Sequence, residues 1–184
     1  MEARVDLLHH IAQATVTIAA EVPESHPSVP VLGGTRYGTG ALVDQRGFVV
    51  TVNYVVVGAD RVSVVDTRGR QHEGILVAHD YSTGIAVLRV PQLDLDPLSP
   101  GSSTTVSVGD DVVTVASVGG EERRSMSAAV ASLDPFDAYW EYRLERALWL
   151  TAANPGLGGG PVCDTLGRIV GIASLNLGAV GRAT

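Results

Sequence analysis

Few side chains of this chain could perform catalysis, and they are poorly grouped. Its 13 residues counted as Lys or Arg are all arginine, which excludes Ser–Lys dyads, Schiff-base lysines and phosphate-loop lysines. The single cysteine, Cys163, cannot form an internal disulfide, and its apolar neighbours favour a buried structural thiol over a nucleophile. His79 and Asp80 are the one adjacent His–Asp pair, but neighbouring residues of a strand face opposite sides. These side chains alone therefore predict no catalytic dyad.

A metal site is not expected from the histidines. His9 and His10 could bind a metal adventitiously, and His72 could approach His79 and Asp80 across a hairpin. Neither group has the His-Glu-x-x-His or paired Cys/His spacing that is typical of metal sites. We therefore expect no metal and no other cofactor.

The most distinctive segment is a glycine-rich loop followed by an apolar strand pattern. It reads Asn154-Pro-Gly-Leu-Gly-Gly-Gly-Pro161 and then Val162-Cys-Asp-Thr-Leu-Gly-Arg-Ile-Val-Gly-Ile172. The segment resembles the nucleophile loop of HtrA/DegP-type serine proteases of the trypsin fold, whose pattern is NPGxSGGP. Gly158 stands at the serine position, and it has no side chain with which to attack a peptide carbonyl.

Two segments of the N-terminal half carry the same resemblance. Residues 38–51 (GTGALVDQRGFVVT) are similar to the family's first hairpin and run into residues 52–60, similar to its NNHVV–xGAD motif. The histidine of that motif, the general base, falls on Tyr54. Residues 80–88 (DYSTGIAVL) resemble DPxTDIAVL, whose second aspartate falls on Gly84.

The resemblance extends over most of the chain. Residues 108–115 and 129–133 are similar to two further strands of the family, so six segments match in the family's order between about residue 11 and about residue 178. The mismatches fall at the catalytic positions of otherwise well-preserved motifs. The chain therefore resembles a pseudoprotease, in which Tyr54, Gly84 and Gly158 replace the triad.

The replaced residues should not support acyl transfer. A phenol has a pKa of ~10, so roughly 0.1% of Tyr54 would be ionised at neutral pH, and Gly84 supplies no carboxylate. The resemblance leaves only the backbone N–H groups of Gly156 and Gly158 as a remnant of the oxyanion hole. Binding and such a hole alone give about 10³–10⁴-fold acceleration, short of the ~10⁶-fold of typical enzymes.

The alternative is an active serine-type endopeptidase that uses displaced residues. Ser82 and Thr83 neighbour the vacant aspartate position, and Thr151 and Ser174 flank the walls of the expected cleft. Each is interpreted first as an ordinary hydroxyl of a strand or turn. The leading hypothesis is thus a non-catalytic peptide- or protein-binding, scaffold or regulatory domain.

The resemblance also implies a peptide site. An extended peptide can add to a protein as a strand through main-chain hydrogen bonds. By resemblance, residues 171–175 form the specificity wall and Ala152-Ala153 lies near the pocket floor. Their small, neutral side chains imply a preference for apolar groups and no charge recognition. The implied peptide-binding residues are Ala152, Ala153, Ile172, Ala173 and Ser174.

The sequence predicts that these residues are positioned by short strands joined by tight turns. Alternating, β-branched segments predict strands, and Pro- and Gly-rich segments predict loops. Residues 23–36 should form an exposed loop, residues 4–12 are compatible with a helix or an extended arm, and residues 137–148 fit helix or strand. The expected strands and hairpins are residues 14–22, 38–51, 61–78, 85–90, 111–118, 124–133, 148–151 and 168–175.

This pattern predicts an all-β barrel or sandwich, and the resemblance implies two Greek-key β-barrels of the trypsin type packed around a cleft. With 184 residues, of which 45% are hydrophobic and 18% charged, we expect one domain over residues 1–184. The first barrel should cover about 11–95, the linker about 91–103 and the second barrel about 104–184. Because the family normally continues further, often into a PDZ domain, we expect a truncated C-terminal end.

Charge and hydropathy limit the partners. The net charge is −7 and no basic stripe is present, so nucleic acid is not an expected partner. No apolar run reaches the ~18 residues of a membrane span, and the N-terminus is a poor signal peptide. The resemblance implies a protein or extended peptide as partner, allows a homo-oligomer, and suggests an extracytoplasmic or membrane-anchored location that the chain itself does not establish.

Overall fold

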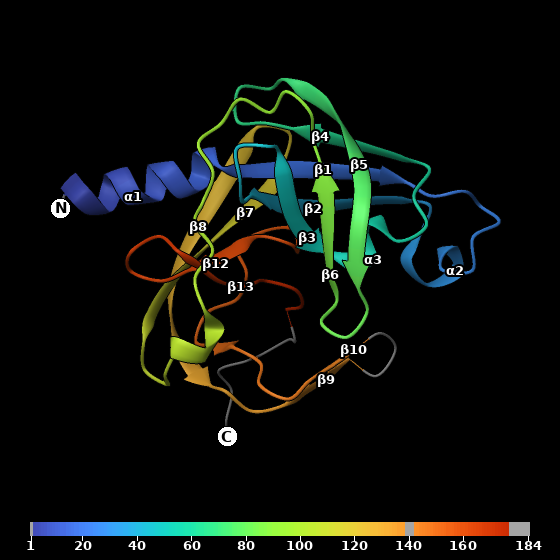
Figure 1. The fold of residues 1–184 in the computed structure, drawn as a ribbon. Helices are drawn as coiled ribbons and strands as arrows, with labels where there is room; N and C mark the ends of the chain where they lie inside the picture. The colour runs from blue at the N-terminus through green and yellow to red at the C-terminus, as the bar shows by residue number, and fades with distance from the viewer. Residues whose placement is uncertain (1, 139–141, 177–184) are drawn as a thin grey trace.

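The computed structural model describes residues 2–138 and 142–176, and it consists mainly of short β-strands in two lobes (Figure 1). The first lobe is a closed barrel with the strand order β1-β2-β3-β6-β5-β4, in which all neighbours are antiparallel. Its strands are β1 (Thr15–Glu21), β2 (Thr35–Leu42), β3 (Phe48–Val52), β4 (Arg61–Val65), β5 (Gln71–Asp80) and β6 (Ile85–Arg89).

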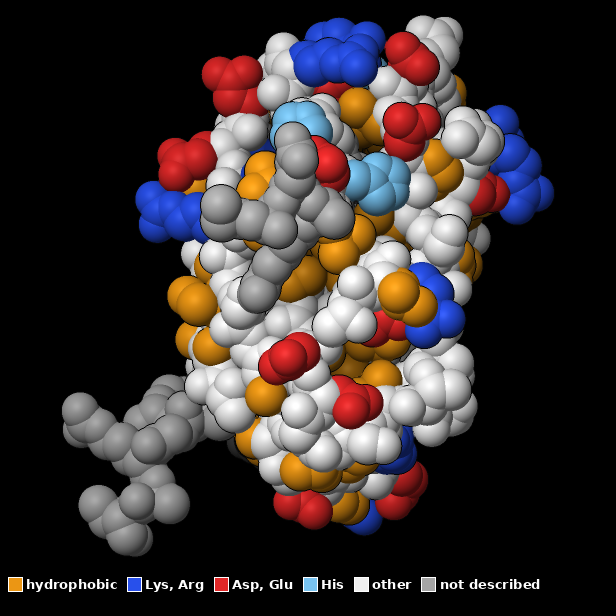
Figure 2. All heavy atoms as spheres, turned by 90° about the vertical axis from the view of Figure 1, so that its left-hand side faces the viewer, with side chains coloured by type: hydrophobic (Ala, Val, Ile, Leu, Met, Phe, Trp, Pro, Cys, Tyr) orange, Lys and Arg blue, Asp and Glu red, His pale blue; other side chains and the backbone are white. Residues whose placement is uncertain are grey.

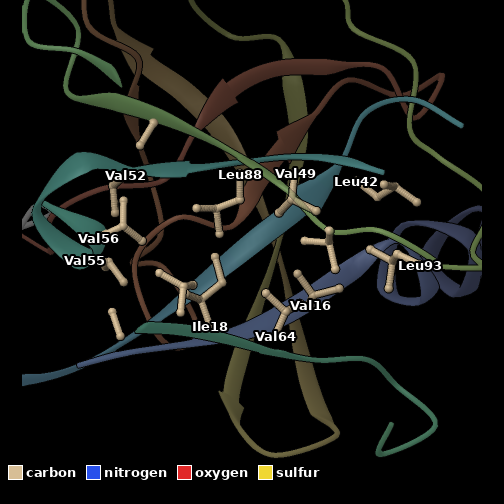
Figure 3. Close-up of a cluster of buried hydrophobic side chains, with 14 of the residues drawn as sticks. Val16, Ile18, Leu42, Val49, Val52, Val55, Val56, Val64, Leu88 and Leu93 are labelled. Atoms are coloured by element: carbon tan, nitrogen blue, oxygen red, sulfur yellow. The ribbon is translucent and has the colours of Figure 1, made fainter. Parts of the chain in front are cut away.

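The core of this barrel is aliphatic (Figure 3). Val16 and Ile18 of β1 are fully buried, as are Val49 of β3 and Leu88 of β6. β-Branched residues suit the pleated surface of a strand, and burial of each such side chain is worth about 1.5–3 kcal/mol. The same buried cluster includes Val52, Val55 and Val56, so the end of β3 and the residues that follow it are packed against the core.

The second lobe is a half-barrel, a five-stranded sheet with the order β11-β8-β7-β12-β13. The expected all-β fold with two barrels of the trypsin type is confirmed, with the second barrel present as a half-barrel in the described residues. A separate two-stranded antiparallel pair, β9–β10, begins at Phe136 and otherwise falls in residues 137–148, for which the sequence left helix and strand open. These strands are β7 (Asp111–Gly119), β8 (Glu122–Ser132), β9 (Phe136–Ala138), β10 (Tyr142–Leu144), β11 (Trp149–Leu150), β12 (Pro161–Cys163) and β13 (Ile169–Ile172).

Helices are short except at the N-terminus. α1 (Glu2–Gln13) resolves the choice between helix and arm in favour of a helix, and its Ile11 packs with Val115 and Cys163 of the second lobe. α2 (Val29–Leu32) corrects the expectation of a loop throughout residues 23–36, since Pro30 is accommodated in the first turn of a helix. The other two are α3 (Asn53–Val56) and the 3₁₀ turn η1 (Ser103–Thr105).

The structure also shows the environment of Cys163 and the end of the last expected strand. Cys163 is fully buried, as expected of a structural thiol, and burial raises its pKa to about 12. The strand expected over residues 168–175 ends at Ile172, because the main-chain groups of Ala173 bond to the glycine-rich loop instead of to a strand.

A half-buried arginine joins the two lobes. Arg123 of β8 donates hydrogen bonds to the carbonyl oxygens of Thr15 (2.8 Å) and Val65 (3.0 Å) and to the Thr17 hydroxyl (2.9 Å). Burial lowers its pKa to about 10, although the carboxylate of Asp66 opposes this effect. Arg123 therefore stays charged at neutral pH and fixes β8 against β1 and β4 of the first lobe.

The outer surface carries charges of both signs. On the face in Figure 2 acidic and basic side chains are interspersed, and no continuous basic patch is visible. Within the described part of the chain, no helix has the length and hydropathy needed to cross a membrane.

Candidate functional site

Tyr54 lies against Gly158, the residue that aligns with the family's nucleophile. α3 begins where β3 ends, and it presents Tyr54 with its ring against the core of the first lobe. The hydroxyl reaches across to the second lobe and donates to the carbonyl oxygen of Ser174 at 3.1 Å. A Cβ atom added at Gly158 would overlap this hydroxyl oxygen and would lie 2.9 Å from the Ser174 carbonyl oxygen. The space for a side chain at position 158 is therefore filled by Tyr54.

A second tyrosine covers Gly84, the residue that aligns with the family's aspartate. Gly84 has a φ of +71°, and a Cβ atom there would overlap the ring of Tyr142 from β10. The Tyr142 hydroxyl forms a hydrogen bond of 2.9 Å with the Ser174 hydroxyl. The Gly84 carbonyl accepts from the backbone N–H of Asn53 at 2.7 Å, so positions 54 and 84 lie side by side. The structure thus brings the three aligned positions together. The Tyr54 hydroxyl lies against Gly158, and the ring of Tyr142 lies over Gly84.

The expected wall of the peptide site is already hydrogen-bonded within the chain. Ala173 donates its N–H to Gly160 at 2.8 Å and accepts from the N–H of Gly159 at 2.7 Å. Ile172 pairs with Pro161 in the sheet, and the carbonyl and hydroxyl of Ser174 both bond to tyrosines. Because neighbouring residues of a strand direct their main-chain groups to opposite edges, the Ser174 carbonyl is the one of these groups that strand addition along the free edge of this wall would need.

The glycine-rich loop is held from both lobes. Thr39 of β2 donates its N–H to the carbonyl of Gly158 (2.7 Å) and its hydroxyl to the carbonyl of Leu157 (2.7 Å). The Asn154 amide donates to the carbonyls of Gly156 (3.0 Å) and Leu157 (3.1 Å). The bonds found for the expected oxyanion-hole residues, Gly156 and Gly158, therefore use their carbonyl oxygens as acceptors.

An arginine that the sequence reading missed supports Tyr54. Arg36 is 5% exposed, and its guanidinium donates to the carbonyls of Tyr54 and Val57 at 3.0 Å each, to the Gly33 carbonyl and to the Ser28 hydroxyl. Burial lowers its pKa. Nothing in the sequence marks this role, since an arginine on a strand is ordinarily read as exposed. Tyr142 was missed because it lies in the segment left undecided.

The displaced hydroxyl candidates are all engaged elsewhere. Ser82 and Thr83 both donate to Asp80, at 2.6 and 2.9 Å, and the side-chain bond from Ser82 is the main reason that the pKa of Asp80 is lowered. His79 bonds to Asn53 at 3.0 Å and not to Asp80. The Thr151 hydroxyl accepts from the Ala129 N–H at 2.9 Å.

The described residues contain no group of three His, Cys, Asp or Glu side chains that could hold a metal ion. Beside the tyrosines lies a cavity of about 420 Å³. It reaches from the rim of the first barrel to the interior of the half-barrel. All five residues expected to bind a peptide line it: Ala152, Ala153, Ile172, Ala173 and Ser174.

Comparisons with known proteins agree with this geometry. A family model described as a trypsin-like peptidase domain matches residues 38–172, a range that contains all three aligned positions. Proteins called probable periplasmic serine endoprotease DegP-like are 34% identical over 137 residues in Hahella chejuensis and 31% identical over 140 residues in Halomonas elongata. Each match covers 74% of this chain and 29% of the relative.

A putative serine protease HhoA from Synechocystis sp. is 31% identical over 140 residues, which is 73% of this chain and 36% of that protein. The chain thus spans about a third of the length of these relatives. The family match covers most of the chain, and the barrel with its half-barrel is the fold that the family requires. This chain belongs to the trypsin-like peptidase domain family and is a homologue of the HtrA/DegP-type serine proteases.

Proposed function

We propose that this chain is a catalytically inactive member of its family, which serves as a non-catalytic binding, scaffold or regulatory domain. The observation that carries the proposal is the position of Tyr54, whose hydroxyl occupies the space that a nucleophilic side chain at Gly158 would need. A substrate carbonyl bound there would meet a phenol that is already donating to Ser174.

The chemistry of the remaining groups supports the same proposal. Acyl transfer in this fold needs a nucleophile, a base for its proton and a carboxylate that orients the base. Tyr54 is a weak base at neutral pH, and Gly84 and Gly158 supply no functional group. The ring of Tyr142 beside Gly84 also excludes water from the place of the carboxylate.

The filled cleft favours a scaffold or regulatory role over capture of an extended peptide. Strand addition needs free main-chain donors and acceptors, and a peptide N–H would have to displace Tyr54 from the Ser174 carbonyl. We infer that a protein partner binds another surface of the domain.

Labelling with a fluorophosphonate probe and hydrolysis of fluorescent casein test the loss of catalysis. The folded chain should show neither labelling nor hydrolysis above a heat-unfolded sample of the same chain, while an HtrA-type protease with an intact triad serves as the positive control. Labelling of a serine, or hydrolysis above the unfolded sample, would overturn the proposal. If labelling occurred, its loss in Ser174→Ala would identify the displaced nucleophile.

A further inference from the structure

Arg36 is a buried cation whose hydrogen-bond partners carry no charge. It lies near the start of β2 and is 5% exposed. Its guanidinium donates to the Ser28 hydroxyl and to the carbonyl oxygens of Gly33, Tyr54 and Val57. Among the described residues no carboxylate forms an ion pair with it, and burial lowers its pKa. A buried charge is ordinarily paired, so an anion beside Arg36 would be stabilised.

Ser28 is the partner at which this cation can be reached from the surface. Arg36 Nη2 donates to Ser28 Oγ at 2.6 Å, and Ser28 is half-buried. His26 Nδ1 lies 2.7 Å from the same oxygen and accepts the Ser28 N–H at 3.3 Å. Because Nδ1 acts as an acceptor here, the Ser28 hydroxyl donates its proton to His26 while it accepts from Arg36. One hydroxyl oxygen thus bonds to both a cation and a base.

The segment that carries Ser28 is a self-contained surface loop. The Val22 N–H donates to the Gly34 carbonyl at 2.7 Å, which brings the ends of the segment together. In the described part of the chain, the main-chain hydrogen bonds of residues 23–33 all lie within this segment, and α2 projects from the side of the first barrel (Figure 1). An enzyme that modifies Ser28 could therefore displace the loop without breaking a sheet.

We propose that Ser28 is a phosphorylation site, and that Arg36 and His26 bind the phosphate. A serine kinase would supply the γ-phosphoryl group of ATP: a P–O bond forms at Ser28 Oγ, the bond to the β-phosphate breaks, and ADP leaves. The hydroxyl proton passes to His26 Nδ1, which already accepts its hydrogen bond. The product carries a charge of about −1.5 to −2 on its phosphate, beside a guanidinium and an imidazolium.

This site would give the domain a means of regulation. Arg36 also holds the carbonyl oxygens of Tyr54 and Val57, at 3.0 Å each. A phosphate on Ser28 would compete for the same guanidinium, so modification of the loop would change the support of α3. The inference does not rest on the loss of catalysis, because neither Ser28 nor Arg36 is an aligned triad position. Phosphorylation and proteolysis can therefore be found or refuted separately.

Phosphorus NMR of the chain with phosphoserine incorporated at position 28 tests the binding of the phosphate. The second pKa of phosphoserine is ordinarily about 6, and an adjacent cation lowers the pKa of an acid by about 1 or more. The phosphate at position 28 should therefore titrate at about pH 5 or below. Phosphoserine in place of the exposed Ser25 of the same loop is the matched control, and it should titrate near pH 6. Equal pKa values at the two positions would overturn the proposal.

Arg36→Met in the protein phosphorylated at Ser28 tests which cation binds the phosphate. The phosphate pKa should return towards 6. Should this variant not fold, as judged by thermal unfolding, His26→Gln replaces it, because His26 is only half-buried. The glutamine variant removes the second cation and should raise the phosphate pKa in part. A phosphate pKa that is unchanged in the folded variant would refute the role of the substituted residue.

Mass spectrometry of the chain purified from the cells that produce it tests whether the site is used. Trypsin cleaves after Arg4 and Arg36, so Ser28 lies in the peptide of residues 5–36 together with Ser25. With phosphatase inhibitors present, fragmentation of this peptide should place a phosphate on Ser28 and none on Ser25. Phosphate on Ser25 instead, or a peptide that stays unphosphorylated throughout growth, would overturn the proposal.

Discussion

The two glycines that align with catalytic residues of the family, Gly84 and Gly158, differ in backbone conformation. Gly84 has a φ of +71°, a region in which a side chain is strained, whereas Gly158 is not among the glycines with positive φ. Without Tyr54, position 158 could therefore carry a side chain once the Ser174 carbonyl oxygen, 2.9 Å from the added Cβ, moved slightly away. Position 84 could not do so without strain, even if Tyr142 were removed. Substitutions at the two glycines should therefore respond differently when the tyrosine beside each is removed.

Gly158→Ser should destabilise the chain by about 1–3 kcal/mol, because its Cβ and hydroxyl would overlap the Tyr54 hydroxyl. In a Tyr54→Ala background the same substitution should cost clearly less, and the remaining loss should come from the Ser174 carbonyl oxygen, 2.9 Å from the added Cβ. The coupling energy from a double-mutant cycle, measured by urea unfolding, should be about 1 kcal/mol or more.

Gly34→Ser is a matched control for this cycle. Gly34 also lacks a positive φ, and a Cβ atom there would make only an ordinary contact, 3.4 Å from the Val22 carbonyl oxygen. Gly34→Ser should lower the free energy of unfolding only slightly, and by the same amount with or without Tyr54→Ala. Additive free energies for Gly158→Ser and Tyr54→Ala would show that the hydroxyl does not occupy the serine position in solution.

Gly84→Asp should be destabilising by about 2 kcal/mol or more, through both positive φ and overlap with the Tyr142 ring. Adding Tyr142→Ala should recover only part of this loss, since the backbone strain remains. Urea unfolding of the single and double variants measures the recovery. Full recovery would mean that the ring alone excludes the aspartate, and no recovery would mean that the ring does not lie over Gly84.

At the scale of elements, the strands were predictable where the alternation of apolar and polar residues extends over a whole strand. β1 was expected over residues 14–22 and spans Thr15–Glu21, because its β-branched residues alternate over a whole strand. β9 and β10 have three residues each, too few for a periodic signal. Their placement depends on Tyr142 meeting Gly84 and Ser174, which are distant in sequence.

The turn between β4 and β5 should make stability depend on acid. Burial alone would raise the pKa of Asp66, but hydrogen bonds from the backbone and side chain of Arg70, from His72 and from the Arg68 N–H lower it to about 2. Because the folded pKa is below the unfolded value of ~3.9, the stabilisation is complete well above pH 4. It is lost as the pH falls from about 4 to about 2, and it amounts to about 2 kcal/mol.

Urea unfolding between pH 7 and pH 2.5 of the unmodified chain and of Asp66→Asn measures this contribution. The asparagine variant should be less stable at pH 7, and the difference between the two proteins should shrink as the pH falls. A difference that stays constant over this range would contradict the low pKa of Asp66.

At the scale of the whole molecule, the motifs predicted which positions meet in the cleft, but the contacts that fill it were not predictable. Tyr54 was identified from its place in the histidine motif, whereas its hydrogen-bond partner Ser174 lies 120 residues further along. The closed first barrel follows from its strand pattern. The packing of α1 on the second lobe does not, because a short amphipathic pattern does not specify which lobe it covers.

The junction between the lobes offers the sharpest test of this arrangement. Arg123→Met should remove the hydrogen bonds to Thr15, Thr17 and Val65 and leave the partly buried carbonyl oxygens of Thr15 and Val65 without this donor. The expected loss is about 2–4 kcal/mol in the free energy of unfolding. Since the lobes would then unfold less cooperatively, the denaturant m-value should fall as well.

The neighbouring residue on β8 provides the control for this substitution. Arg124 has a side chain that is 62% exposed and pairs with the equally exposed Glu122 at 3.1 Å. Arg124→Met removes the same charge at the adjacent position, and it should change stability by less than about 1 kcal/mol without altering the m-value. Equal losses for both variants would mean that charge, and not the buried contacts of Arg123, determines the effect. An unchanged m-value for Arg123→Met would show that the two lobes unfold together without this arginine.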